Sequence, residues 1–287
     1  MKEITGRTRL TGLVGSPVAH SISPMMHNEA FNLLGLDYVY MAFDVGPEQL
    51  NTAVKGLKAL QVRGFNLTMP HKTAMAAMAD ELSPVARLCG AVNTIVNDHG
   101  TLKGYTTDGI GYMRSAKEAG HPLPGKKMTL LGAGGAASAI IAQAALDGVK
   151  EIRVFNRKSP TYEKAEAFVE KVCQSTHCPV TLYDINDTDT LYESILLSDI
   201  VTNSTNVGMS PNEDGCLIKD ISVFHKGLVV SDIIYNPRET KLLRLAREQG
   251  CETFNGLYML LYQGAESFRL WTGADMPVDR IKEKYIL

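Results

Sequence analysis

The chain has 287 residues, 45% of them hydrophobic and 21% charged, so its length allows two domains and its composition is that of an ordinary globular protein. Its net charge is −2, which gives no general electrostatic reason to expect nucleic acid or an anionic membrane as a partner. No run of about 18 apolar residues occurs, and no apolar stretch follows the charged N-terminal residues. We therefore expect neither a membrane span nor a signal peptide.

Cysteine usage indicates a reducing compartment. The five cysteines are scattered and lack paired CxxC spacing, so we expect reduced thiols in a cytoplasmic protein. Cys173, His177 and Cys178 are close in sequence, but no second pair of ligands follows them. We expect no metal site.

The first 112 residues alternate short apolar runs with helical ones, which is typical of an α/β domain with a largely parallel sheet. The expected strands are 9–14, 37–43, 64–67 and 91–96. The expected helices are 24–34, 47–60, 73–79 and 85–88. Two stretches in this half carry chemistry.

The first stretch holds Ser21 and Ser23, in the loop after the first strand. Pro24 is well placed to begin a helix, for which Ser23 would be the N-cap. Ser21 has no such local role. Two hydroxyls at this spacing in a loop can instead bind the hydroxyls of a polyol.

The second stretch is Asn-Leu-Thr-Met-Pro-His-Lys at 66–72, between a strand and a helix. Pro70 suits the first position of a helix. Lys72 then lies in the first turn, where the helix dipole disfavours a cation by roughly 0.3–1 kcal/mol. An amide, a hydroxyl and an amine thus converge at a strand end, which indicates a binding site, although a surface lysine after a turn would look similar.

Residues 113–255 read as a second α/β domain. A strand at 127–131 leads into Gly132-Ala133-Gly134-Gly135-Ala136-Ala137, an alanine-rich helix to about residue 146 and another strand at 152–155. This is G-x-G-x-x-A within a βαβ unit, so we expect a dinucleotide whose pyrophosphate lies on the helix N-terminus. Further strands are expected at 180–183, 200–203 and 228–233.

The end of the second strand indicates the cofactor. NAD sites usually carry an acid there, whereas NADP sites favour a nearby arginine. This chain has Asn156-Arg157-Lys158-Ser159, whose positive charges favour a 2′-phosphate. These residues could also form a solvated basic corner, so NADP is favoured and NAD is not excluded.

The last region, 256–287, is expected to form helices that return to the first domain. Gln263 lies there among mostly apolar neighbours. A glutamine in such a place is either a hydrogen-bonded core residue or a residue that faces a cleft.

Together these motifs resemble the shikimate dehydrogenase family over nearly the whole chain. The resemblance rests on five motifs in the family's order: the loop 15–24, residues 66–72, Gly-Ala-Val-Asn-Thr at 90–94, Thr-Asp-Gly at 107–109 and the glycine-rich turn. Residues 156–158, 233–237 and 260–265 look closest to its quinate/shikimate branch.

Two positions depart from the family pattern. Thr106 stands where the family usually has Asn, so the loop before Asp108 could differ slightly. Ser159 stands where the quinate/shikimate branch can carry an Asp that favours NAD. The second departure argues against a strict NAD preference.

The resemblance implies reversible NAD(P)-linked interconversion of shikimate and 3-dehydroshikimate, and leaves quinate open as a second substrate. It implies that Lys72 and Asp108 form the catalytic pair. Substrate would be bound by these residues: Ser21, Ser23, Thr68, Asn93, Tyr235 and Gln263. Besides the glycine-rich turn and residues 156–159, Ile233 and Gly256 would contact the cofactor.

The implied fold is α/β with two domains, a substrate domain at 1–112 and a Rossmann-like domain at 113–255, completed by the C-terminal helices. The resemblance does not decide between shikimate and quinate as substrate or between NAD and NADP as cofactor. It also leaves open whether the protein is a homodimer. Two other classes compete with this interpretation: another NADP enzyme of the methylene-tetrahydrofolate dehydrogenase type, and a non-catalytic NAD(P)-binding sensor. Neither gives a reason for the paired serines and the Lys72–Asp108 pair together.

Overall fold

The structure is a computed structural model that describes residues 3–285, so residues 1, 2, 286 and 287 of the expected domains lie outside it. The chain divides into two compact units. Unit 1 is Met1–Thr107 with Leu261–Leu287, and unit 2 is Asp108–Leu260. The sequence suggested divisions at 112/113 and 255/256.

Unit 1 is built on a six-stranded mixed sheet with the order β2-β1-β3-β5-β6-β4. Its strands are β1 (Arg9–Gly15), β2 (Tyr38–Asp44), β3 (Gly64–Leu67), β4 (Glu81–Leu82), β5 (Thr94–Asp98) and β6 (Thr101–Tyr105). Strand β1 pairs in parallel with β2 and β3, whereas β5 runs antiparallel to both β3 and β6. The end of β3 and the start of β5 therefore meet at one edge of the sheet.

Helices cover both faces of this sheet. They are α1 (Ser23–Leu33), η1 (Pro47–Gln49), α2 (Leu50–Ala59), α3 (Lys72–Ala76), α4 (Pro84–Cys89), the part of α10 (Leu257–Thr272) from Leu261 onward, and α11 (Val278–Tyr285). Apolar residues of α2, α3 and α4 pack on one face around Phe65 and Ile95. On the other face, rings of α1 and α10 stack around β2, with His27 4.5 Å from Tyr40 and Phe31 5.0 Å from Phe268.

Unit 2 is built on a six-stranded parallel sheet with the order β12-β11-β10-β7-β8-β9. Its strands are β7 (Lys127–Leu131), β8 (Glu151–Asn156), β9 (Val180–Asp184), β10 (Ile200–Asn203), β11 (Val229–Asp232) and β12 (Glu252–Phe254). This is the doubly wound order in which ligands bind beyond the carboxyl ends of the strands where the order reverses. In unit 2 the reversal lies between β7 and β10.

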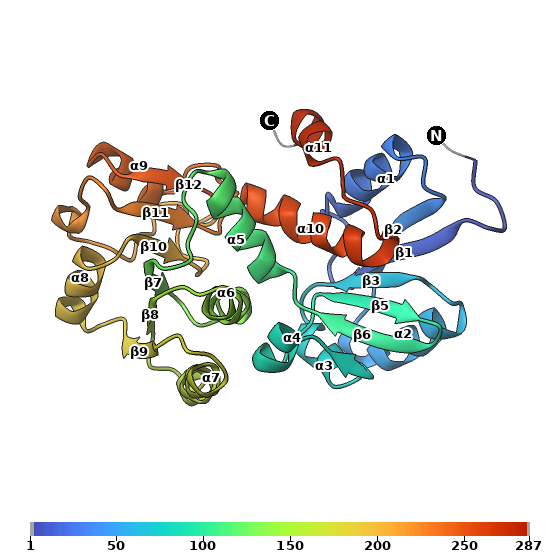
Figure 1. Cartoon of the computed structure of the whole chain (residues 1–287), viewed down its shortest axis with the longest axis horizontal. Coiled ribbons are helices and arrows are strands. Elements are labelled where there is room, and N and C mark those ends of the chain that lie inside the picture. The colour runs from blue at the N-terminus through green and yellow to red at the C-terminus, as the bar shows by residue number, and fades with distance from the viewer. Residues whose placement is uncertain (1–2, 286–287) are drawn as a thin grey trace. The chain divides into compact units, whose positions relative to one another are not determined.

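The helices of unit 2 lie on both faces of its sheet, α5, α6 and α7 on one and α8 and α9 on the other (Figure 1). They are α5 (Asp108–Glu118), α6 (Gly135–Leu146), α7 (Tyr162–Ser175), α8 (Thr188–Leu196), η2 (Ile221–Val223) and α9 (Lys241–Glu248). Because helices cover both faces of this sheet, its strands contain continuous apolar runs. The expected α/β fold class is confirmed. Within residues 3–285 no helix is long and apolar enough to cross a membrane.

Candidate active site

The stretch 66–72 joins β3 to α3 in unit 1. Lys72 is the first residue of α3, as expected, but Pro70 is not: it lies in the preceding turn, and His71 occupies the N-cap position. The buried His71 uses its Nε2 to contact the carbonyl oxygen of Val45 at 2.7 Å. That contact anchors the turn to the segment after β2, so the histidine serves to position the lysine beside it.

Thr68 lies one residue beyond β3, where its backbone N–H donates to Val14 O at 3.0 Å. Its side chain packs against the backbone of Gly15, because a Cβ atom at residue 15 would come within 2.2 Å of Thr68 Cγ2. Gly15, the last residue of β1, therefore allows the loops after β1 and β3 to approach each other. Those two loops carry Ser21 and Thr68.

The two serines play different local roles from those expected. The N-cap position of α1 is Ile22, and Ser23 is the first residue of the helix, with Pro24 next. The Ser21 hydroxyl accepts a hydrogen bond from the Ser23 backbone N–H at 3.2 Å. The expectation that Ser23 caps the helix was wrong. The Ser21 hydroxyl, rather than that of Ser23, binds a backbone N–H at the start of the helix. The Ser23 hydroxyl therefore takes part in other contacts.

The Ser23 hydroxyl belongs to a buried polar network. Burial raises the pKa of the Tyr40 hydroxyl, and the hydrogen bond between Ser23 and Tyr40 lowers it by a smaller amount. The Tyr40 hydroxyl donates to Asn66 Oδ1 at 2.8 Å. The amide of Asn66 donates in turn to three acceptors: Asn93 O at 3.1 Å, Thr94 Oγ1 at 3.0 Å and Ser267 Oγ at 3.0 Å. Asn66 thus links β2, β3, β5 and α10.

Asn93 continues this network toward α10. Its Oδ1 accepts from the backbone N–H of Thr107 at 2.8 Å, and its amide donates to Thr107 Oγ1 at 2.9 Å and Gln263 Oε1 at 3.4 Å. Ser267, one turn after Gln263, bonds to Thr94 Oγ1 at 2.7 Å. Because every link is a hydrogen bond among buried or half-buried groups, the orientation of the Gln263 amide depends on residues from four separate segments.

Backbone hydrogen bonds place Lys72 next to this network. Val92 N donates to Lys72 O at 3.0 Å, and Leu67 N donates to Asn93 O at 2.8 Å. The segment 90–94 therefore lies alongside the stretch 66–72. Unit 1 brings together six of the expected residues around the ends of β1 and β3 and the start of β5: Ser21, Ser23, Thr68, Lys72, Asn93 and Gln263.

Thr106, which departs from the family pattern, is accommodated by a local bond. It is 5% exposed, and its Oγ1 donates to Ala91 O at 2.5 Å. The threonine thus ties the loop before Asp108 to the segment that carries Asn93. Asp108 itself is the first residue of α5 in unit 2 and is half-buried.

In unit 2 the glycine-rich turn joins β7 to α6, as expected. The first glycine, Gly132, has φ +103°, a left-handed conformation that favours glycine. No side chain caps α6, whose N-cap residue is Gly134. A Cβ atom at residue 134 or 135 would meet nothing within 4 Å. The first N–H groups of α6 therefore have no side-chain partner and face open space. A pyrophosphate can bind to such groups, so these residues fit a dinucleotide.

The loop after β10 packs against this turn at the point where the strand order reverses. Ser204 Oγ donates to Leu131 O at 2.6 Å, and a Cβ atom at residue 132 would lie 2.8 Å from Thr205 Cγ2. Sequence reasoning did not single out this loop. Its position follows from the pairing of β7 with β10, which the amino-acid pattern does not specify.

The basic residues after β8 are exposed. Asn156 ends β8 and accepts from the Ile185 N–H at 3.0 Å, and Ser159 Oγ is 3.0 Å from Thr161 Oγ1. Within the described part of the chain, neither Arg157 nor Lys158 is within 4 Å of a carboxylate. Their charges are not neutralised by the protein, which suits a phosphate group next to them.

The expected residues after β11 gather beside β12 and α10. Gly256 packs against the backbone of Ile233, since a Cβ atom at residue 256 would lie 1.8 Å from Ile233 O. Ile233 and Tyr235 line one pocket of about 400 Å³ together with the loop 204–210. Tyr235 is 46% exposed. Unit 2 therefore places these three residues close together, at the carboxyl edge of its sheet.

A buried carboxylate supports that edge. Asp232 is 1% exposed and accepts hydrogen bonds from Asn203 Nδ2 at 3.1 Å, the Ile234 N–H at 3.0 Å and Thr240 Oγ1 at 2.8 Å. Burial raises the pKa of Asp232 to about 6, and these hydrogen bonds work in the opposite direction. Asp232 thus fixes the backbone on which Ile233 and Tyr235 lie.

Sequence reasoning missed three members of the unit 1 network: Tyr40, Thr94 and Ser267. Only Ser267 carried a usable signal, because it lies four residues after Gln263 and so on the same helical face. Tyr40 resembled any buried strand residue, and its contact with Asn66 joins positions far apart in the chain.

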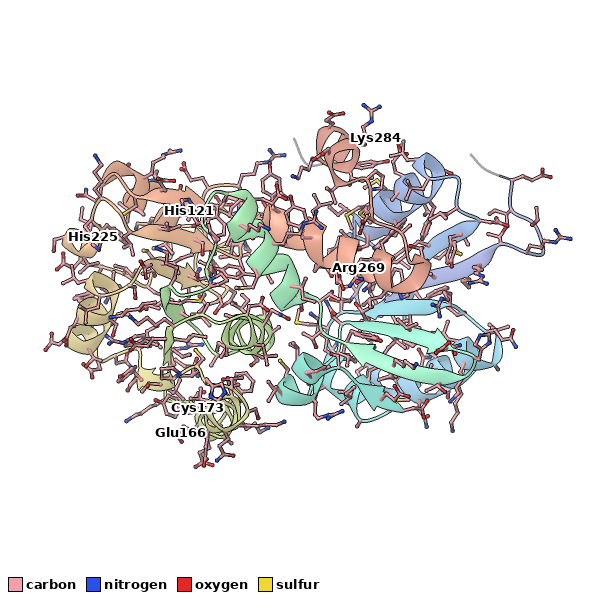
Figure 2. All side chains as sticks on the ribbon, in the orientation of Figure 1. His121, Glu166, Cys173, His225, Arg269 and Lys284 are labelled. Atoms are coloured by element: carbon pink, nitrogen blue, oxygen red, sulfur yellow. The ribbon has the colours of Figure 1, made fainter. Side chains whose placement is uncertain are left out.

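The cysteines and the histidine near residue 175 form no metal site. Cys173 lies on α7 (Figure 2) and donates to Val180 O at 3.2 Å. Burial raises the pKa of Cys178 to about 11. All five cysteines are free thiols. In residues 3–285 no group of three or more His, Cys, Asp or Glu side chains could hold a metal ion.

Comparison with known proteins identifies the family. The family model of the shikimate dehydrogenase substrate binding domain matches residues 13–95, that of shikimate/quinate 5-dehydrogenase matches residues 114–224, and that of the shikimate 5′-dehydrogenase C-terminal domain matches residues 256–284. A shikimate dehydrogenase (NADP+) of Listeria monocytogenes is 55% identical over 282 residues, which are 98% of this chain and 97% of that protein. The chain belongs to the shikimate dehydrogenase family.

Two other relatives show how far this similarity extends. A quinate/shikimate dehydrogenase of Escherichia coli is 48% identical over 281 residues, 98% of each chain. The crystal structure of a Listeria monocytogenes shikimate 5-dehydrogenase in complex with shikimate and NAD matches with a TM-score of 0.96 at 54% identity, over 99% of this chain and 98% of that one. The family and the enzyme class expected from the motifs, an oxidoreductase acting on a CH–OH group, are confirmed.

Proposed function

We propose that this protein catalyses the reversible NAD(P)-dependent oxidation of shikimate to 3-dehydroshikimate, a step of aromatic amino-acid biosynthesis. The observation that carries the proposal is that every residue expected at the site is present in a chain that is 55% identical to a shikimate dehydrogenase across nearly its whole length. The two ligands of the Listeria monocytogenes structure, shikimate and NAD, support the same reaction.

Unit 1 supplies hydrogen-bonding groups suited to a polyhydroxy acid. Ser21 and Ser23 are the proposed partners of the carboxylate. Thr68, Asn93 and Gln263 are the proposed partners of the ring hydroxyls, and unit 2 adds Tyr235. The buried network behind Asn93 and Gln263 fixes their amide orientations before substrate arrives, which lowers the ordering cost of binding.

Lys72 and Asp108 are the proposed catalytic residues. When the ketone is reduced, the Lys72 ammonium group gives a proton to the developing alkoxide oxygen, and in alcohol oxidation the neutral amine takes that proton back. Asp108 is the proposed partner that orients the lysine. The bound nicotinamide cofactor supplies the chemistry of hydride transfer. His71 and Val92 hold the backbone of Lys72 in place through their contacts with Val45 and with Lys72 O.

The residues present fit NAD(P). The N-terminus of α6 offers uncapped N–H groups beneath open space for the pyrophosphate, and Arg157 and Lys158 carry unneutralised charge at the end of β8. Ile233 and Gly256 are the proposed contacts at the other end of the cofactor. NADP is the favoured cofactor, because no acid follows β8 to bind a ribose diol.

A spectrophotometric grid tests the reaction. Purified protein is assayed with shikimate and quinate, each with NADP+ and with NAD+, by following absorbance of the reduced nicotinamide. We expect the highest kcat/KM for shikimate with NADP+. Turnover of neither acid with either cofactor would contradict the proposal, and would favour a sensor that binds NAD(P) without reaction.

Quinate is the second candidate substrate, favoured by the 48% identity to the quinate/shikimate dehydrogenase of Escherichia coli. One extra ring hydroxyl separates the two acids, so the same pocket can serve both. We further propose that the enzyme works in the cytoplasm. A homodimer stays open, and light scattering on the purified protein tests it.

A further inference from the structure

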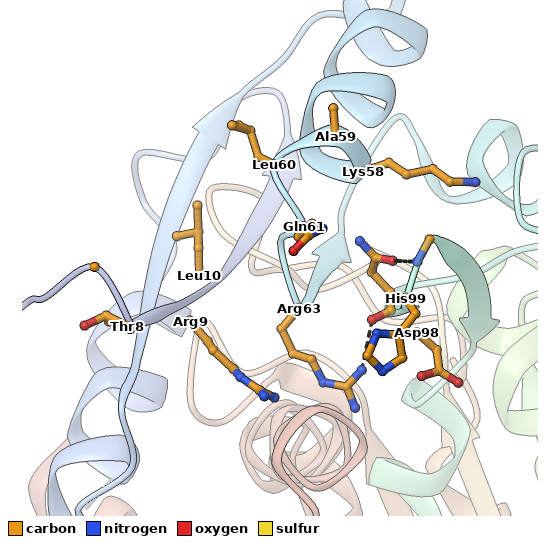
Figure 3. Close-up of a pocket in the computed structure, with 13 residues that line it drawn as sticks. Thr8, Arg9, Leu10, Lys58, Ala59, Leu60, Gln61, Arg63, Asp98 and His99 are labelled. Atoms are coloured by element: carbon orange, nitrogen blue, oxygen red, sulfur yellow. Dashed lines mark hydrogen bonds between the residues drawn. The ribbon is translucent and has the colours of Figure 1, made fainter.

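A pocket of about 660 Å³ opens on unit 1 away from the proposed substrate residues. It is lined by the start of β1, the end of α2, the start of β3 and the turn between β5 and β6 (Figure 3). Strands β1 and β3 are parallel, and their opposite ends lead to Ser21 and Thr68. The pocket therefore lies at the other edge of the sheet.

Two guanidinium groups converge at this pocket. Arg63 Nε donates to Trp271 O at 2.9 Å, and its Nη1 donates to Asn97 O at 2.9 Å. Arg9 Nη1 donates to the Tyr38 hydroxyl at 3.3 Å, and that hydroxyl donates to the same Trp271 O at 3.3 Å. Both guanidinium groups point in the same direction, and the His99 ring lies beside Arg63 (Figure 3).

Within the described residues neither arginine forms a direct ion pair, although the Asp98 carboxylate interacts electrostatically with Arg63. Among residues 3–285, no carboxylate lies within 4 Å of Arg9 or Arg63. The acid in the pocket wall, Asp98, pairs with Lys103 at 2.9 Å, and Lys58 pairs with Asp80 at 3.5 Å. The two guanidinium groups carry like charges and are linked only through the Tyr38 hydroxyl and Trp271 O, so a small anion between them would reduce their repulsion.

The donors that remain suit a phosphate group. A guanidinium group has five N–H donors, and the hydrogen bonds above use two of them on Arg63 and one on Arg9. Arginine binds phosphate oxygens through paired, charge-assisted hydrogen bonds. The volume of the pocket is within the range of small-molecule sites.

Two non-glycine residues with positive φ line the pocket. Gln61 has φ +54° and His99 has φ +51°, and in the described part of the chain these are the two non-glycine residues with positive φ. Both line this pocket. Both lie in turns that require positive φ: Gln61 follows the C-cap of α2, and His99 is in the two-residue hairpin turn between β5 and β6. Asparagine or glycine would be enough for the conformation of residue 99 in this turn. Histidine at that position also places an imidazole ring in the pocket wall.

We propose that this basic pocket is a second ligand site, which binds a small phosphorylated anion with two or more negative charges through Arg9, Arg63 and His99. It is separate from the substrate and cofactor residues.

Calorimetric titration with pyrophosphate tests the site at constant ionic strength, on protein saturated with NADP so that the nucleotide site is filled. We expect one bound pyrophosphate. Arg9→Gln should weaken it about tenfold or more, because a charge-assisted hydrogen bond contributes roughly 1.5–3 kcal/mol. Arg9 is exposed and makes a single hydrogen bond, to Tyr38, so this variant should fold normally.

Two control variants locate the binding. Arg280→Gln, on α11 of the same unit, removes a charge that pairs with Glu283 outside the pocket and should leave pyrophosphate affinity unchanged. Arg157→Ala in unit 2 should also leave it unchanged. The proposal is overturned if pyrophosphate does not bind, if Arg9→Gln binds it as tightly as the parent protein, or if Arg157→Ala alone weakens it.

Discussion

Asn66 is the residue on which the proposed substrate site depends most. It is 7% exposed, and its amide satisfies four partners from β2, the loop before β5, β5 and α10. The four partner residues are all buried. The side chain thus acts on substrate only through Asn93 and Gln263, which makes it a positioning residue.

We predict that Asn66→Ala lowers the free energy of unfolding by about 1–3 kcal/mol, because buried polar groups are left without partners. It should also raise KM for shikimate more than it lowers kcat. Urea denaturation and steady-state kinetics measure the two effects. Asn32→Ala, on the exposed side of α1, is the control and should change neither. An Asn66→Ala variant with unchanged stability and KM would contradict the role given to the network.

Lys72 is predicted to act in the chemical step. Lys72→Ala should lower kcat by about 100-fold or more with little change in KM, because proton transfer by a positioned side chain typically contributes 10²–10⁴-fold. Lys55→Ala, at an exposed position of α2, is the matched control. A kcat for Lys72→Ala near that of Lys55→Ala would remove Lys72 from the mechanism.

Arg157 is predicted to select the cofactor. Arg157→Ala should weaken NADP about tenfold and NAD little, because only NADP presents a 2′-phosphate to the guanidinium group. Fluorescence titrations with both reduced cofactors measure this. Equal losses for the two cofactors would show that Arg157 is only part of a solvated basic corner.

At the scale of elements, the docking of α10 on the sheet of unit 1 depends on one glycine. Trp271 Nε1 donates to Ile95 O at 2.9 Å, and a Cβ atom at Gly64 would lie 2.2 Å from that nitrogen. The indole ring of Trp271 therefore lies directly against β3. Trp271 is 1% exposed, and it is the one tryptophan of the chain.

We predict that Gly64→Ala destabilises the protein by about 1–3 kcal/mol, since an added methyl group must displace the indole ring from a packed site. The emission of Trp271 should shift to longer wavelength as the ring becomes more exposed. Gly56→Ala is the matched control: a Cβ atom there meets nothing within 4 Å inside α2, so it should stabilise by up to about 1 kcal/mol. Equal effects of the two substitutions would contradict this account.

Local signals in the sequence predicted most of the helices and strands but not β4, β6 or β12, and they could not predict non-local contacts. The turn at 132–137 was recognisable because its glycines, strand and helix are contiguous. The Pro70 helix start and the Ser23 cap were wrong because each helix begins at another residue: α3 begins at Lys72, and Ile22 occupies the N-cap position of α1. Tyr40 and Ser267 could not be placed, since their shared partner Asn66 is far away in the chain and hydrogen-bond pairing leaves no periodic pattern.

At the scale of the whole molecule, stability should respond to the protonation of Asp232. Its pKa is raised to about 6 from an ordinary value of 3.8 by burial, so between these values the folded state binds more protons than the unfolded state. The free energy of unfolding therefore falls as pH rises from about 4 to 6. A shift of this size corresponds to roughly 3 kcal/mol.

We predict that, between pH 4.5 and 7, the parent protein loses more of its unfolding free energy than Asp232→Asn does, as measured by urea denaturation at each pH. Asp220→Asn is the control of opposite sign, because hydrogen bonds from Ser222 lower the pKa of Asp220, so its contribution is lost as pH falls. Parallel pH profiles for the parent and Asp232→Asn would show that the carboxylate is not stabilised in its neutral form.

Unit 1 is assembled from two separate parts of the chain, and unit 2 is made between them. As the chain leaves the ribosome, β1 to β6 emerge long before Ser267 and Trp271, so Asn66 lacks one of its acceptors and the β3–β5 face lacks its indole cover. The whole sheet of unit 2, through β12, emerges in that interval. The nucleotide-binding unit can thus mature during translation, whereas the unit that carries Lys72 is completed only after α10 has been synthesised.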